Sequence, residues 1–281
     1  MIKGLAKSFN YNKMEIMSII LVFVLGLFFG SLVNAVSYRL ETEEDFVFSR
    51  SRCPKCSHTL SLKDLIPLLS FALLKGKCRY CRKPISWKYP LIEIITGLVF
   101  LSLYFKVASD NYFAYLETGV VFLIFVVLEI IFIYDFKNYL IPDNAVIIAV
   151  VFAFIYRAAF SIDRAINVFN QDFFYSIITA VFLWLIFWSV SFLSKEKLLG
   201  FGDSGLAFFN GFFLGWPMAL ISLFSTFFIG AIIGLGLIAF GRKKLNSQLA
   251  LGPLMVLGIY LIFLFGEDID GFLNRFLTIP F

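Results

Sequence analysis

The stretch Leu199-Gly200-Phe201-Gly202-Asp203-Ser204-Gly205 places a carboxylate among glycines, directly before a run of 35 residues without charge, 206–240. An ionised Asp costs about 2.5–3.5 kcal/mol near the centre of a bilayer, and acids in membrane segments usually mark function. Glycine permits backbone angles and close approaches denied to other residues, so the carboxylate can be presented on an open turn that water reaches. Asp203 is therefore a candidate catalytic residue. The alternative is that Asp203 only N-caps the following helix, because Asp is among the best capping residues.

Composition identifies the chain as a membrane protein. Hydrophobic residues make up 60% of its 281 residues and charged residues only 15%, which is typical of a protein whose solvent is lipid. The net charge is +5, but the lysines and arginines are grouped in particular loops, and this pattern indicates membrane orientation rather than nucleic-acid binding. We expect an all-α polytopic membrane protein with no nucleic-acid role.

Apolar segments of spanning length, or nearly so, recur along the chain. The first is longer than the apolar region of a signal peptide, and we expect it to be retained. The charge-free run is too long for one crossing, and Trp216-Pro217 is expected to break it into a short helix and a full one. The pattern predicts about eight transmembrane helices, at 16–36, 91–105, 113–134, 145–160, 173–193, 206–240 (two helices) and 249–265, followed by a polar tail.

The basic residues favour one side of the membrane. With eight spans, the loops after helices one, three, five and seven share a side, and they hold 17 of the 24 Lys and Arg residues. Because the basic side is ordinarily cytoplasmic, we expect the 39–90 loop in the cytoplasm and both termini outside. The same count places Asp135, at the end of the third helix, and Asp203, at the start of the sixth, together at the cytoplasmic membrane surface.

All four cysteines lie in the 39–90 loop, as Cys53-Pro54-Lys55-Cys56 and Cys78-Arg79-Tyr80-Cys81. Two C-x2-C sequences separated by 21 residues are typical of a zinc site with four thiolate ligands. Two disulfides are the alternative, although the cytoplasm keeps thiols reduced. His58 is an alternative ligand. We expect a structural zinc, because four thiolates leave no open position for a catalytic water, and its binding would supply much of the folding free energy of the loop.

These features divide the chain into three parts. Residues 1–38 form an amino-terminal tail and the first transmembrane helix, and residues 39–90 form the cytoplasmic, cysteine-rich zinc-binding loop. Residues 91–281 form a multi-helix membrane domain that carries both candidate acids.

A series of motifs in compatible order resembles the type IV prepilin peptidases, the leader peptidase and N-methyltransferase family of GxGD aspartic membrane proteases. The motifs cover most of the chain. Besides the paired C-x2-C sequences they are 30–40 (GSLVNAVSYRL), 64–70 (DLIPLLS), 76–79 (GKCR), 85–93 (ISWKYPLIE), 135–143 (DFKNYLIPD), 200–203 (GFGD), 211–216 (GFFLGW) and 251–253 (LGP).

The resemblance implies a multi-pass protein of the bacterial cytoplasmic membrane, in which Asp135 and Asp203 form an aspartic protease pair. One carboxylate would activate water while the other, protonated, polarises the scissile carbonyl. The implied substrates are type IV prepilin or pseudopilin precursors, cleaved between a short basic leader and an apolar helix. The resemblance also implies N-methylation of the new amino terminus with S-adenosylmethionine, by residues that the sequence does not identify. Asp143 is expected to cap the helix after Pro142 rather than to join the pair.

Position 205 departs from the family pattern, because Gly205 stands where the family has lysine. If that lysine steers the substrate or tunes the acid pair, activity or specificity is expected to differ. Two other functions stay open. One is a non-catalytic assembly factor for a pilus or secretion machine, with the zinc loop as a docking surface. The other is a proton-coupled transporter, because acids at helix ends and broken apolar runs also occur in such proteins.

Overall fold

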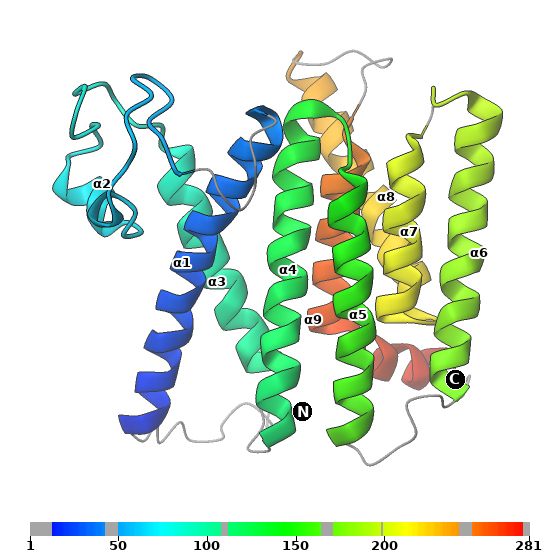
Figure 1. Ribbon diagram of the computed structural model, residues 1–281. Coiled ribbons are helices and arrows are strands. Elements are labelled where there is room, and N and C mark those ends of the chain that lie inside the picture. The colour runs from blue at the N-terminus through cyan, green and yellow to red at the C-terminus, as the bar shows by residue number, and fades with distance from the viewer. Residues whose placement is uncertain are drawn as a thin grey trace. The chain divides into compact units, whose positions relative to one another are not determined.

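The structure, a computed structural model, describes residues 13–42, 50–107, 112–163, 171–197, 199–241 and 249–277. The expected all-α architecture with about eight long helices is confirmed (Figure 1). In the described part of the chain these helices are α1 (Lys13–Thr42), α3 (Lys88–Val107), α4 (Tyr112–Asn138), α5 (Asp143–Asp163), α6 (Gln171–Ser194), α7 (Phe201–Leu214), α8 (Met218–Ala239) and α9 (Leu251–Leu277). A 3-10 turn, η1 (Leu62–Asp64), and the short α2 (Leu69–Leu73) lie between α1 and α3.

Six of the described helices are long and apolar enough to cross a membrane, namely α1, α3, α4, α6, α8 and α9. The predicted break at Trp216-Pro217 is confirmed, since α7 ends at Leu214 and α8 begins at Met218. The last helix is longer than predicted, because α9 continues through the charged residues after 265 to Leu277. No proline occurs between Pro253 and Pro280, so the helix persists where the hydropathy falls.

Several basic residues that entered the orientation argument lie outside the described residues. They are Lys3, Lys7, Arg164 and the run Arg242-Lys243-Lys244.

The chain divides into two compact units, each described here by itself. In the first unit, formed by the described residues of 1–36 and 45–105, α1 and α3 approach closely at small residues. A Cβ added to Gly26 would lie 2.7 Å from the Cα atom of Gly97, and one added to Gly30 would lie 2.6 Å from the Cα atom of Glu93. Such contacts let two helices pack backbone to backbone, as is common in membranes.

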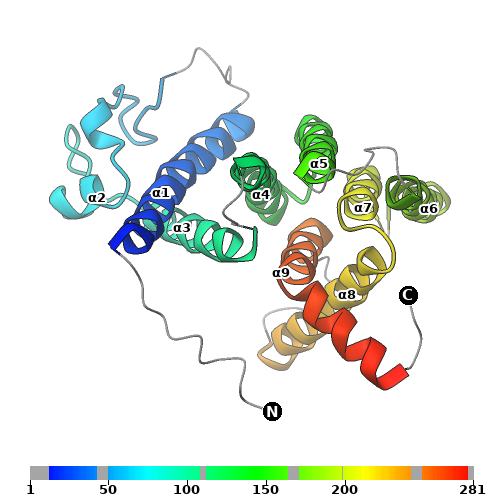
Figure 2. The same ribbon diagram turned by 90° about the horizontal axis from the view of Figure 1, so that it is seen from below.

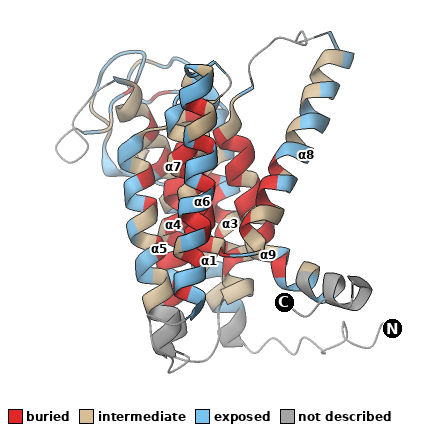
Figure 3. Cartoon of the chain, turned by 90° about the vertical axis from the view of Figure 1, so that its right-hand side faces the viewer, coloured by how far each residue is buried: buried red, intermediate tan, exposed pale blue. Residues whose placement is uncertain are grey.

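In the second unit, α7 is the central helix. It packs against α5, α6, α8 and α9, while α4 packs against α5 and α9 (Figure 2). Phe125, Phe213 and Phe263 form a ring cluster in this unit, with centroids 5.2–6.3 Å apart. Exposed side chains on the outer helices are largely apolar, as along the second half of α8 (Figure 3), which is expected of a surface that faces lipid.

Arg157 of α5 stabilises the carboxyl end of α7. Its Nε atom donates to the carbonyl of Phe212 at 2.8 Å, and its Nη2 atom donates to the carbonyl of Phe213 at 3.3 Å. Its guanidinium carbon also lies 5.7 Å from the centroid of the Phe212 ring. The last carbonyls of a helix have no partner within the helix, and in lipid no water replaces one. Arg157 supplies the missing donors.

The contact between α6 and α7 depends on Gly211. A Cβ added there would lie 2.6 Å from the Cα atom of Ala180 and 2.7 Å from its backbone nitrogen. Because backbone atoms rather than a flexible side chain occupy this space, α6 and α7 would have to separate to admit even a methyl group.

We therefore predict that Gly211→Ala lowers the free energy of unfolding by about 1–3 kcal/mol, because the added methyl overpacks this interface. Thermal unfolding of the purified protein in detergent measures the effect. Gly236→Ala is the matched control, because a Cβ at Gly236 would meet nothing within 4 Å. Equal losses in the two variants would contradict the prediction.

Candidate active site and metal site

Asp135 lies in the last turn of α4 and is only 4% exposed. Its Oδ2 atom accepts a hydrogen bond from the backbone N–H of Gly252, in the first turn of α9, at 3.0 Å. Position 252 has no room for a side chain, because an added Cβ would lie 2.5 Å from that same oxygen. The carboxylate of Asp135 is therefore held directly against the start of α9.

Asp203 lies in the first turn of α7 and is half-buried. The alternative interpretation of Asp203 as the N-cap is wrong in position, because Gly200 is the N-cap and Asp203 is the third helical residue. Its Oδ2 atom accepts the backbone N–H of Gly200 at 2.9 Å, so it satisfies one free donor of the helix end from that position. Both candidate acids thus have one oxygen bound at a helix amino terminus, where the helix dipole favours negative charge.

The structure brings the two carboxyl groups together. They are 68 positions apart in the sequence, yet close enough for their charges to interact. Ile141, in the connection between α4 and α5, lies against the second residue of each helix, Gly202 in α7 and Gly252 in α9. A Cβ added to Gly202 would lie 2.8 Å from the Cβ atom of Ile141, and one added to Gly252 would lie 3.1 Å from its Cδ1 atom. One isoleucine therefore sets how closely α7 and α9 approach the end of α4.

Ser191 of α6 also positions this site, and sequence reasoning missed it. Its buried hydroxyl lies 2.8 Å from the carbonyl oxygen of Leu199 and 3.0 Å from that of Gly200. These contacts hold the segment that leads into α7. A serine within an apolar helix carries no signal of such a role. Gly252 belongs to the LGP motif, but that motif does not predict its contact with Asp135.

Two other positions from the sequence analysis lie away from the carboxyl pair. Gly205 faces α5, where an added Cβ would lie 3.2 Å from the Cγ1 atom of Val146. It borders an apolar cavity of about 510 Å³ whose lining includes Val150, Trp184 and Phe208. A side chain at 205 would therefore enter this cavity. Asp143 is the exposed first residue of α5, in the first turn where an acid complements the helix dipole.

The four cysteines are positioned to bind a metal ion. The Sγ atoms of Cys53, Cys56, Cys78 and Cys81 all lie within 4.8 Å of one another, and those of Cys53 and Cys81 are 4.0 Å apart. All four are free thiols, so the disulfide alternative does not describe this arrangement. Tetrahedral thiolate coordination at about 2.3 Å from a metal requires sulfur atoms about 3.8 Å apart, which this cluster approaches.

The two C-x2-C turns have the same backbone pattern. In the first, the N–H of Ser57 donates to the carbonyl of Cys53, and the N–H of Cys53 donates to that of His58. In the second, Arg82 donates to Cys78, and Cys78 donates to Lys83, in the same way. The alternative ligand His58 is outside the described sulfur cluster, and its ring lies against that of Tyr80, with centroids 3.7 Å apart and planes tilted by 36°.

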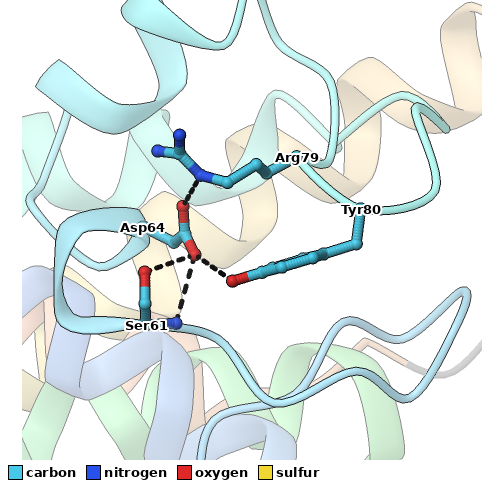
Figure 4. A network of polar contacts seen from close by, with 4 residues as sticks. All are labelled: Ser61, Asp64, Arg79 and Tyr80. Carbon is cyan, nitrogen blue, oxygen red and sulfur yellow. Dashed lines mark hydrogen bonds and ion pairs between the residues drawn. The ribbon is translucent and has the colours of Figure 1, made fainter.

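Asp64 joins the two turns through a network of polar contacts (Figure 4). It lies in η1, between the turns, and its Oδ1 atom accepts from Nε of Arg79 at 2.6 Å. Its Oδ2 atom accepts from the hydroxyl of Tyr80 at 3.2 Å, and from the hydroxyl and backbone N–H of Ser61 at 2.7 and 3.1 Å. Because Arg79 and Tyr80 are the two residues between Cys78 and Cys81, Asp64 fixes the second turn against the segment that follows the first.

The network keeps Asp64 ionised. Partial burial alone would raise the pKa of Asp64, but the hydrogen bonds from Arg79 and Ser61 outweigh burial and lower the pKa from 3.8 to about 2. A depressed pKa in the folded state means that the stabilisation is fully present above the unfolded value. It is lost only as the pH falls through about 2.

We predict that Asp64→Asn weakens metal binding by about tenfold or more, because the variant loses the negative charge that holds Arg79 of the second turn in place. Competition with a chelator on the purified full-length chain measures the affinity. Since Asp64 does not titrate there, the ratio of affinities between the parent chain and the variant should stay constant between about pH 5 and pH 8. The same change at Asp268, an exposed acid of α9, is the control and should leave the affinity unchanged.

Two family models match the chain. The Bacterial Peptidase A24 N-terminal domain matches residues 24–107, which include the second part of α1 and the cysteine turns, and the Type IV leader peptidase family matches residues 121–235, which include both candidate acids. No solved structure matches the chain.

Similar curated proteins bear the name prepilin leader peptidase/N-methyltransferase. One from Aeromonas hydrophila is 26% identical, over 92% of this chain and 94% of its own length. One from Bacillus subtilis (strain 168) is 28% identical, over 90% of this chain and 96% of its own length. One from Myxococcus xanthus (strain DK1622) is 30% identical, over 82% of this chain and 66% of its own length. The similarity therefore extends over nearly the whole chain.

Proposed function

Because the chain belongs to the type IV leader peptidase family, we propose that it is a membrane aspartic endopeptidase that removes the short basic leader of type IV prepilin-like precursors. The observation that carries the proposal is the meeting of Asp135 and Asp203, from the ends of two helices far apart in the sequence, within range of each other's charge. Each carboxyl group is anchored through its Oδ2 atom, so the Oδ1 atoms are the ones offered to a reacting peptide.

The carboxyl pair would act as one unit that holds a single proton, since two like charges that interact across a low-dielectric site do not ionise together easily. The ionised carboxylate takes a proton from water as the water oxygen attacks the scissile carbonyl carbon. The protonated partner donates to the carbonyl oxygen and so stabilises the tetrahedral intermediate. Collapse of that intermediate passes a proton to the departing nitrogen and releases the leader.

The helix ends that carry the pair would lie at the cytoplasmic face of the bacterial inner membrane. The sequence supports this orientation, because 17 of the 24 Lys and Arg residues fall on that side when eight spans are counted. A precursor whose basic leader stays in the cytoplasm and whose apolar helix enters the bilayer would bring the bond between them to this depth. Asp203, which is half-buried, is the member of the pair that water reaches more easily.

We also propose that the chain methylates the amino terminus that cleavage exposes, with S-adenosylmethionine as the methyl donor. The names of the similar proteins, which join leader peptidase and N-methyltransferase, support this second activity. The two reactions follow naturally in order, because the amine that accepts the methyl group exists only after the peptide bond is cut.

Zinc is the metal we propose for the four cysteines. A set of four thiolates from two short turns suits zinc, and it leaves no position for a reacting water. The ion would be a structural link that holds the two turns together, since so small a loop buries little apolar surface. Cys53, Cys56, Cys78 and Cys81 would be its ligands.

We predict that Asp135→Asn and Asp203→Asn each lower the rate of leader removal by at least about a hundredfold, because each removes one proton-transfer group of the pair. Mass spectrometry of the amino terminus of a co-expressed precursor measures cleavage, and the same spectrum reports methylation. Asp143→Asn is the matched control, because Asp143 is an exposed acid eight residues beyond Asp135. Undiminished processing by either variant of the pair would rule out this mechanism.

For the metal, elemental analysis of the purified chain should find about one zinc per molecule. The double variant Cys53→Ser/Cys56→Ser should lose the metal, because a single remaining turn offers only two thiolates. His58→Ala should retain it, since the His58 ring lies against Tyr80 and outside the sulfur cluster. Loss of zinc from the His58 variant, or its retention in the double variant, would require a different ligand set.

A further inference from the structure

The cysteine module, defined here as residues 50–88, is strongly basic. It contains ten Lys and Arg residues and one acid, Asp64, which gives it a formal net charge of +9. All ten basic residues are exposed, and Asp64 is already paired with Arg79. The other acids of the loop, at positions 41 and 43–45, precede the module, and 43–45 lie outside the described residues. The module therefore attracts negatively charged surfaces.

The same module exposes large apolar side chains. Leu62 is 86% exposed, Leu73 is 72% exposed and Trp87 is 76% exposed. Leu69 is also exposed, and it shares a face of α2 with Leu73, four residues later. These residues lie on adjoining segments, because η1 packs against α2 and the ring of Phe71 contacts that of Trp87 with centroids 4.9 Å apart. We call Leu62, Leu69, Leu73 and Trp87 the apolar edge. Exposed apolar side chains gathered in this way indicate an interaction surface.

A hydrogen bond to α3 fixes the position of the apolar edge along that helix, and therefore its depth in the membrane. The backbone N–H of Leu68, just before α2, donates to the Oε2 atom of Glu93 at 2.9 Å. Glu93 is the sixth residue of α3, so it lies about 7.5 Å along the helix from Lys88. Because α3 is a candidate membrane span from Lys88 onward, α2 lies beside its first turns, as Figure 1 shows. The rise of about 7.5 Å from Lys88 to Glu93 is close to the thickness of one headgroup layer, which is about 5–8 Å.

Lysines accompany the apolar edge along the chain. Lys63 follows Leu62 directly, Lys75 follows Leu73 by two residues, and Lys88 follows Trp87 directly. A lysine at the membrane surface can keep its ammonium group among the headgroups while its stem and its apolar neighbours lie deeper. Tryptophan is enriched at the same depth.

We propose that the cysteine module docks on the membrane surface, with the apolar edge at the boundary of the acyl chains and its lysines on the headgroups of anionic phospholipids. The basic leader of a prepilin would be repelled by the module, which stays strongly positive after the proposed zinc and four thiolates contribute −2, so the proposed substrate does not fit this surface. An acidic protein would suit the charge, but it does not account for an apolar edge tied beside a membrane-spanning helix. The docking does not depend on peptidase activity.

Photo-crosslinking tests the proposal on the full-length chain. Benzoylphenylalanine in place of Leu73, in vesicles with equal amounts of phosphatidylglycerol and phosphatidylcholine, should give mainly phospholipid adducts by mass spectrometry. The phosphatidylglycerol adducts should exceed the phosphatidylcholine adducts by about twofold or more, because the neighbouring lysines concentrate the anionic lipid. The same replacement at Lys55, an exposed position in the first C-x2-C turn and outside the apolar edge, should give few lipid adducts.

The charge contribution is tested separately with Lys63→Gln/Lys75→Gln/Lys88→Gln in the crosslinking chain, with metal content as the check that the module is folded. This variant should still form lipid adducts at position 73 but lose the preference for phosphatidylglycerol. An unchanged preference, equal lipid adducts at positions 55 and 73, or no lipid adducts at 73 would each overturn the proposal. Protein adducts in place of lipid adducts at 73 in cells would overturn it in favour of an acidic protein partner.

Discussion

The hydrogen bond from Gly252 to the buried carboxylate of Asp135 is the contact on which the rest of the membrane site depends. A carboxylate in an apolar interior is costly unless it is hydrogen-bonded, and here the donor is the amino end of a helix, with its favourable dipole. Asp203 is held in the same manner by the start of its own helix. Two helix amino termini therefore face two acids, and their partial positive charges offset the repulsion between the carboxylates.

The sequence could predict the parts of the fold that depend on local composition. Apolar segments and the Trp216-Pro217 break depend on local composition, so the helices α1 and α3–α9 could be anticipated, with errors only at ends such as that of α9. The number of membrane spans between Asp135 and Asp203 was enough to predict that both lie on the same side of the membrane. The positioning contacts were not predictable, because Ile141, Ser191 and the N–H of Gly252 act on residues from other helices. Packing between distant segments decides those contacts, and no local pattern encodes it.

The cysteine site shows the same division between local pattern and packing. Cysteine spacing predicts four clustered thiols, since each pair needs only a short turn with two backbone hydrogen bonds. Asp64 could not be recognised in this way, because its partner Arg79 is 15 residues away. Its network also has an electrostatic effect beyond the metal site. The one acid of the module is buried under its own arginine, so the outer surface of the module is left almost uniformly positive.

The shortness of α7 has a consequence for the helices that surround it. Its 14 residues rise about 21 Å, whereas the hydrocarbon core of a bilayer is about 30 Å thick. Its amino end carries Asp203 and its carboxyl end is closed by Arg157, so neither end can be extended to make up the difference of about 9 Å. Because α5, α6, α8 and α9 pack around α7 and most of its residues are buried, these helices rather than lipid cover the missing length. Backbone beyond a helix end at membrane depth is tolerated where protein covers it or where it borders water, so a short central helix lets water approach its ends without exposing them to lipid.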